Sequence, residues 1–297
     1  DDVYIDAGSV SATIASTGGG GFEAVTINTA AATTSITDTI DTTAATLTAT
    51  STVAEGGTIT YTVTLGAPVT GSAVVVTLAA GQTITIPVGA SSGTATAVAA
   101  DNVFAGGGSV VNSIAAISGG NFEQLTPNTT PVTTTVTDDG DATTVSLSAT
   151  ASVVEGGSIV YTATLTNAAQ TPVTVTLANG AVITIAANAT SGSVSVAAPG
   201  DDPYVDAGTV TTTIATATGG NFESLVIDTS AASTSVSDDV DATSVTLSAT
   251  PSVAEGGAIV YTATLTNAAQ TPVSVTLSSG QTITIAANAT SGSISIA

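Results

Sequence analysis

Two short stretches of this sequence concentrate carboxylates in a chain that has no group to neutralise them. Residues 138–141 (DDGD) and 238–241 (DDVD) each hold three Asp residues, one hundred positions apart. The chain has 22 Asp and Glu residues and no Lys, Arg or His, so its formal net charge is −22. Like charges a few ångströms apart repel by about 1 kcal/mol even in bulk water. A cation from solution is therefore the expected partner of these carboxylates.

The chemistry available to such a cation is restricted to oxygen ligands. Cys and His are absent, which disfavours soft transition metals. A flexible mixture of Asp, Glu and backbone oxygens favours Ca²⁺, which takes six to eight oxygen ligands, over Mg²⁺. The alternative is that the acidic stretches are only solubilising turns, because Asp is a common turn residue.

Composition excludes several classes of protein. A chain without basic residues has no side chain to displace counterions from phosphate, so neither nucleic acid nor an anionic membrane surface is an expected partner. No apolar run approaches the roughly 20 residues of a membrane span, so no membrane insertion is expected. No signal peptide is recognisable, and any export signal is expected outside this sequence. The lack of Cys rules out disulfides and a thiol nucleophile.

The carboxylates belong to a repeat with a period of one hundred residues. Glu55, Glu155 and Glu255 each begin an EGG triplet, and each is followed six positions later by Tyr. Both ends of the sequence fall inside a repeat, so we expect a window on a longer array. The predicted domains are the C-terminal part of an Ig-like repeat at 1–41, whole Ig-like repeats at 42–141 and 142–241, and the N-terminal part of another at 242–297.

Within a repeat, alternation of apolar and polar residues predicts β-strands with one buried face. In the second whole repeat we predict seven strands, near 143–149, 157–166, 172–178, 181–186, 192–198, 207–216 and 225–237. Seven short strands separated by Gly, Asn, Pro and Asp are typical of an immunoglobulin-like sandwich. The predicted fold class is all-β, a tandem array of seven-stranded immunoglobulin-like β-sandwiches without helices.

Strand direction predicts which acidic loops share one end of each sandwich. Successive antiparallel strands reverse direction, so the loop with Glu155, the loop at 201–206 and the exit at 238–241 should converge. The opposite end should carry the GGNFE loop. The predicted metal ligands are Glu55, Asp101, Asp138, Asp139, Asp141, Glu155, Asp201, Asp202, Asp206, Asp238, Asp239, Asp241, Asp1, Asp2, Asp6, Asp38, Asp41, Glu123 and Glu223.

The repeats differ at positions that matter for metal binding. Asn102 stands where the neighbouring repeats have Asp2 and Asp202, and Gly106 stands where they have Asp. Thr39 replaces the middle Asp of the linker triplet. We expect these sites to bind fewer ions, or to bind them more weakly.

At EGG, DDPYVDAG, GGNFE and SDDVDAT, the sequence resembles the extender repeats of giant RTX biofilm adhesins of the LapA-like family, which type I secretion exports from Gram-negative bacteria. The placement of the acidic loops is also similar to the Calx-beta variant of the sandwich. The resemblance implies an extracellular, Ca²⁺-stiffened stalk at the bacterial surface or in the biofilm matrix. Its implied partners are adjacent repeats, an adhesive tip and a cell-surface anchor outside this sequence.

Other functions remain open at this stage. A paired-carboxylate glycosidase is the strongest enzyme hypothesis, but the chain offers no aromatic platform for a sugar, so no enzyme is expected. A self-assembling matrix fibre or surface-layer protein could be built from the same repeats by lateral association. A third possibility is a module that binds glycans through Ca²⁺ and contacts them with aromatic residues near the sandwich ends. The alternative role of these aromatic residues is to close the ends of the hydrophobic core. These residues are Tyr4, Phe104, Tyr204, Phe22, Phe122 and Phe222.

Overall fold

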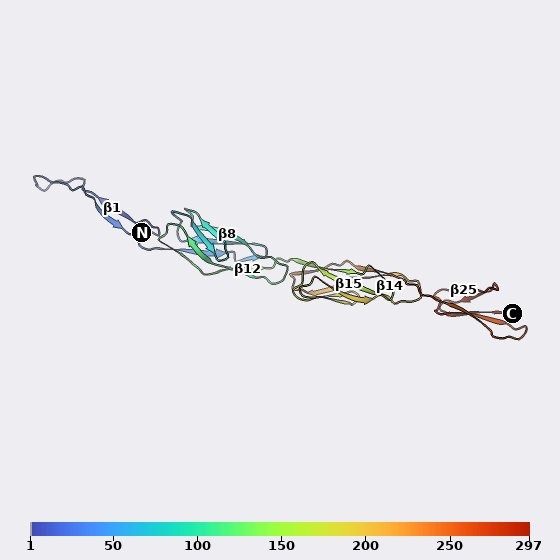
Figure 1. Ribbon diagram of the computed structural model, residues 1–297. Coiled ribbons are helices and arrows are strands. Elements are labelled where there is room, and N and C mark those ends of the chain that lie inside the picture. Colours follow the sequence, from blue (N-terminus) through green and yellow to red (C-terminus); the bar gives the residue numbers. More distant parts are fainter. Residues whose placement is uncertain (1) are drawn as a thin grey trace. The chain divides into compact units, whose positions relative to one another are not determined.

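The computed structural model describes residues 2–297, and every regular element in that range is a β-strand (Figure 1). The prediction of an all-β chain built from tandem β-sandwiches is confirmed. The chain forms two compact units, Asp1–Asp141 and Ala142–Ala297. Within the described residues, no helix has the length and apolar character needed to cross a bilayer.

The first unit contains the whole repeat 42–141, which folds as three small sheets. A four-stranded sheet has the order β11-β3-β5-β8, and two three-stranded sheets have the orders β4-β12-β9 and β10-β6-β7. The strands are β1 (Gly8–Ala12), β2 (Ala32–Ile36), β3 (Thr42–Ala49), β4 (Thr52–Ala54), β5 (Thr58–Leu65), β6 (Val74–Leu78), β7 (Thr83–Ile86), β8 (Ser92–Val98), β9 (Ser109–Asn112), β10 (Ile114–Ser118), β11 (Gln124–Pro127) and β12 (Val132–Thr137).

The second unit repeats this arrangement in residues 142–241. Its sheets have the orders β18-β15-β13-β21, β14-β22-β19 and β17-β16-β20, and two further sheets, β23-β24-β27 and β25-β26, follow. The strands are β13 (Ala142–Ala149), β14 (Ser152–Val154), β15 (Ser158–Leu165), β16 (Val173–Leu177), β17 (Val182–Ile185), β18 (Ser191–Ala197), β19 (Gly208–Thr212), β20 (Ile214–Gly219), β21 (Ser224–Ile227), β22 (Ala232–Ser237), β23 (Val245–Ala249), β24 (Ile259–Leu265), β25 (Val273–Thr276), β26 (Thr282–Ile285) and β27 (Ser291–Ile296).

The core forms because side chains alternate across each strand. In β5, Ile59, Tyr61, Val63 and Leu65 are buried, whereas the Thr residues between them face outward or are half-buried. Apolar residues from the facing strands, such as Val76, complete one contiguous cluster. With few aromatic residues, each core is built from many small aliphatic contacts.

Two predicted strands of repeat 142–241 are each divided in the structure. The short strand β14 was not predicted. Segment 207–216 became β19 and β20, and segment 225–237 became β21 and β22, because each half pairs in a different sheet. β21 pairs in parallel with β13, whereas β22 pairs in parallel with β14. Periodicity detects an extended segment but not a change of partner, so it could not locate these breaks.

The part-repeats expose residues that a whole repeat buries. Phe22 is 74% exposed, whereas Phe122 and Phe222 are only 7% and 8% exposed. Likewise Leu247 is 53% exposed and Leu47 only 7%. In the first part-repeat, β1 and β2 pair only with each other and every residue in them is exposed. The burial of one half of the sandwich therefore depends on the strands of the other half.

Candidate metal centres

Strand register brings three segments of repeat 142–241 to one end of the sandwich. β14 runs parallel to β22 with Val154 opposite Ser237, and β19 runs antiparallel to β22 with Gly208 opposite Val236. The residues just beyond β14, just before β19 and just beyond β22 must therefore be neighbours. These positions carry Glu155, the acidic loop 201–206 and the acidic exit 238–241.

Two groups of carboxylates share Glu155 at this end. Oxygens of Glu155, Asp206 and Asp238 lie within 4.8 Å of one another, and so do oxygens of Glu155, Asp201 and Asp239. Glu155 is only 5% exposed, and its Oε1 atom has no hydrogen-bond partner. A buried carboxylate oxygen without a partner is costly unless a proton or a cation satisfies it.

The electrostatics of this end raise the pKa of two carboxyls. Burial is the main cause of the raised pKa of Glu155, and the negative charges of nearby Asp residues add to it, opposed by a hydrogen bond from the backbone of Asp239. The pKa of Asp201 is raised mainly by the charge of Asp239, and then by that of Asp241. The surroundings of both carboxyls therefore disfavour the ionised form when no cation is nearby.

Some of the predicted ligands have a structural role within their own loop. The backbone N–H of Tyr204 donates to Asp202 Oδ1 at 2.9 Å, which is a turn of the Asx type. The backbone N–H of Asp206 donates to Asp238 Oδ1 at 3.0 Å and so fastens the acidic loop to the exit strand. The interpretation of acidic residues as turn formers therefore describes Asp202 well, but it does not describe Glu155.

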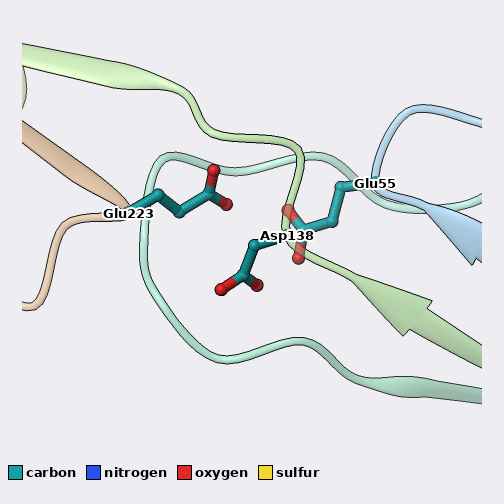
Figure 2. A group of neighbouring side chains, drawn as sticks. All are labelled: Glu55, Asp138 and Glu223. Carbon is teal, nitrogen blue, oxygen red and sulfur yellow. The ribbon is translucent and has the colours of Figure 1, made fainter.

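Repeat 42–141 satisfies its equivalent glutamate internally. The side-chain amide of Asn102 donates to Glu55 Oε1 at 3.1 Å and to Oε2 at 2.9 Å, and the Asn102 backbone N–H also donates to Oε2 at 2.9 Å. Glu55 also lies near Asp138, with carboxylate oxygens within 4.8 Å (Figure 2). Glu223, the third side chain labelled there, belongs to the second unit. In this repeat, amide protons occupy the place that a cation could take at Glu155.

Other predicted ligands also lie close together. Oxygens of Asp101, Asp139 and Asp141 lie within 4.8 Å of one another. A pocket in the first unit is lined by Asp2, Asp6, Asp38 and Glu123, among others. Glu123 Oε2 accepts a hydrogen bond of 2.6 Å from the backbone N–H of Asp41.

The two remaining predicted ligands are Glu223 and Asp1. Glu223 lies between β20 and β21, at the end of its repeat opposite Glu155, and does not join the Glu155 groups. Asp1 lies outside the described residues. Sequence reasoning noted Asn102 as a departure from the pattern but missed that its amide would bind Glu55, because that contact joins loops 47 residues apart.

The raised pKa values of Glu155 and Asp201 predict that the stability of the second unit depends on pH. A carboxyl with a raised pKa in the folded state binds more protons folded than unfolded, so it destabilises the fold at neutral pH. In chelator, we expect the melting temperature of the second unit to rise as the pH falls from neutral through these raised pKa values, and to level off near about pH 4. Circular dichroism melts at several pH values would measure this for wild type and for the Glu155→Gln, Asp201→Asn double variant, whose melting temperature should change less with pH. An equal change of melting temperature with pH in the two proteins would contradict the prediction.

Comparison with known protein families matches the repeat pattern. The family model of the LapA domain matches residues 1–39, 41–139, 141–239 and 241–297 in succession. No curated protein matches the chain. The four matches together cover nearly all of the sequence.

Proposed function

The chain belongs to the LapA domain family, and from this premise we propose that it is a calcium-stiffened extender region of a secreted bacterial surface adhesin. LapA adhesin repeats are a structural, non-enzymatic kind of protein exposed at the cell surface. In the proposal, tandem sandwiches hold an adhesive tip away from the cell during biofilm formation or surface attachment. The tip and the anchor would lie in other parts of the adhesin.

The observation that carries the calcium proposal is the environment of Glu155. Its buried Oε1 has no partner, and four further carboxylates from two other segments lie within 4.8 Å of one of its oxygens. The chain has no basic residue that could neutralise this group. Ca²⁺ fits the donor set because it accepts six to eight hard oxygens in irregular geometry.

The proposed ion would act by joining segments that otherwise repel one another. Glu155 follows β14, Asp206 precedes β19, and Asp238 follows β22 at the start of the linker that leads to the next repeat. A cation held by all three would fasten the linker to the end of its own repeat. Loss of the ion would leave the linker carboxylates unscreened and repelling, so the linker would gain freedom.

Composition supports the proposed route of export. A chain without Cys forms no disulfide that would have to be made or broken during transport, and so can cross a type I secretion channel unfolded. Calcium is plentiful outside the cell, where folding would then occur. Binding to the folded state alone stabilises that state by mass action, so the metal would favour folding after export.

Small-angle X-ray scattering of the 297-residue chain tests the stalk proposal. With Ca²⁺ we expect one narrow distribution of particle dimensions, and with excess EGTA a broader one, because the linkers gain freedom. The same measurement with Mg²⁺ in place of Ca²⁺ tests whether the narrowing is specific to Ca²⁺. Identical profiles with Ca²⁺ and EGTA would remove the basis for calcium stiffening and favour the fibre or glycan-binding alternatives.

A further inference from the structure

The tyrosine of the first acidic loop reaches into the next repeat. Tyr4 belongs to the part-repeat 1–41, yet its hydroxyl donates a hydrogen bond of 2.6 Å to the backbone carbonyl of Pro68 in repeat 42–141. Its ring stacks on Phe122, with the centroids 5.5 Å apart and the planes at 30°. Tyr4 and Val3 pack against the core cluster of that repeat.

Backbone hydrogen bonds surround this aromatic pair. Tyr4 and Phe122 form an isolated antiparallel bridge. The N–H of Ile5 donates to the carbonyl of Asn121 at 3.1 Å, and the N–H of Glu123 donates to the carbonyl of Val3 at 3.0 Å. The Asn121 side-chain amide also donates to the carbonyl of Ile5 at 2.9 Å. None of these contacts uses a carboxylate, so none requires a cation.

The hydroxyl hydrogen bond of the tyrosine recurs in the second unit. The Tyr204 hydroxyl donates to the carbonyl of Ala268 at 2.7 Å, again 64 residues further along the chain. Tyr204 lines a pocket together with Leu265, Val273 and the loop that connects their strands. The bond forms at the same position of the repeat in both units, although the residues around the tyrosine differ, VYID in one and PYVD in the other. The contact therefore does not depend on one particular flanking sequence.

The loop beside Tyr4 has a backbone conformation that requires glycine at two positions. Gly119 and Gly120 have φ values of 89° and 75°, in the left-handed region that favours glycine. A Cβ at Gly119 would lie 2.2 Å from the carbonyl oxygen of Ala73. The paired glycines of the GGNFE motif therefore hold Phe122 in the position where Tyr4 stacks on it.

We propose that repeat 42–141 and the part-repeat 242–297 each carry a metal-independent docking site for the tyrosine of the preceding acidic loop, which we call the tyrosine latch. The latch consists of Tyr4 or Tyr204, the acceptor carbonyl of Pro68 or Ala268, and in the first unit Phe122. It fastens the linker through a hydroxyl and an aromatic ring, directly beside the acidic loop, where the Tyr4 N–H donates to Asp2 Oδ1 at 2.8 Å. Position 104 carries Phe, which has no hydroxyl to donate, so the hydrogen-bonded form belongs to positions 4 and 204.

Amide hydrogen exchange in the full chain tests the latch. The N–H groups of Ile5 and Glu123 bond across the contact, so their exchange rates report its opening. In EGTA, Tyr4→Phe removes only the hydroxyl and should raise both rates about fivefold, because a net hydrogen bond contributes on the order of 1 kcal/mol. Tyr204→Phe should raise exchange in residues 201–206 by a similar factor.

A matched control makes the same chemical change elsewhere. Tyr161 is fully buried and its hydroxyl has no hydrogen-bond partner, so Tyr161→Phe should leave the exchange of Ile5 and Glu123 unchanged. Circular dichroism checks that each variant is folded. The latch proposal is wrong if the Ile5 and Glu123 amides of the Tyr4→Phe variant exchange at the wild-type rate in EGTA. It is also wrong if the substitution raises these exchange rates only when Ca²⁺ is present. The calcium proposal is judged separately, by the effect of EGTA on scattering of the wild type.

Discussion

Replacing Glu155 by Gln is expected to abolish most of the calcium-dependent rise in the melting temperature of the second unit. In wild type, Ca²⁺ at about a hundred times its dissociation constant should raise that temperature by on the order of 10 °C relative to EGTA. Glu155 belongs to both carboxylate groups at its end of the repeat, so its loss weakens both. The substituted amide side chain also carries no charge, so the variant should be more stable than wild type in EGTA. Calorimetry with and without Ca²⁺ measures both effects.

Glu255→Gln is the control for this experiment. Glu255 occupies the equivalent position in residues 242–297 but is exposed, and no carboxylate group found among residues 2–297 includes it. Its replacement changes the net charge equally and should leave the calcium-dependent rise intact. If Glu155→Gln keeps the full rise while Glu255→Gln reduces it, the ion is held elsewhere and the proposed centre is wrong.

Replacing Asn102 by Asp is expected to create a calcium centre in repeat 42–141. The change removes the amide donors that satisfy both oxygens of Glu55 and places a further carboxylate beside it. In EGTA the first unit should lose stability, because two carboxylates then face each other without a proton or cation. With Ca²⁺ the stability should return. Isothermal titration should find about one more bound ion per chain than in wild type.

Asn128→Asp controls for the added charge. Asn128 Oδ1 accepts a hydrogen bond of 2.9 Å from the Thr130 N–H, and Asp228 makes the same contact with Ser230 in the next repeat. An Asp is therefore already compatible with this turn, which contains no member of the carboxylate groups. Asn128→Asp should add no ion. An unchanged stoichiometry for Asn102→Asp would show that the amide of Asn102 does not stand in for a cation.

These predictions imply that the repeats of one stalk differ in their need for calcium. Repeat 142–241 has a buried glutamate oxygen without a partner, whereas the Asn102 amide satisfies Glu55 in repeat 42–141. The tyrosine latch adds a fastening that needs no ion. Stiffness along the array would then vary from one repeat to the next, according to a few substitutions in the acidic loops.

The sequence by itself determined the fold class, the repeat and the end of each sandwich where the carboxylates gather. Alternation such as that of Ile59, Tyr61 and Val63 reports burial directly, because successive side chains in a strand face opposite sides. Alternating strand direction then predicted that Glu155 shares an end with the acidic exit 238–241, and the parallel pairing of β14 with β22 places them together in the structure. These conclusions need only local periodicity and the order of strands.

Only the tertiary structure decided which carboxylates need a partner and which already have one. The orphaned oxygen of Glu155, the amide of Asn102 on Glu55 and the hydroxyl of Tyr4 on Pro68 all depend on distances between loops far apart in the chain. Such distances follow from how the sheets pack, and residue types within one loop do not encode them. The physical reason is that hydrogen bonding and burial are properties of assembled neighbours, whereas periodicity is a property of a single strand.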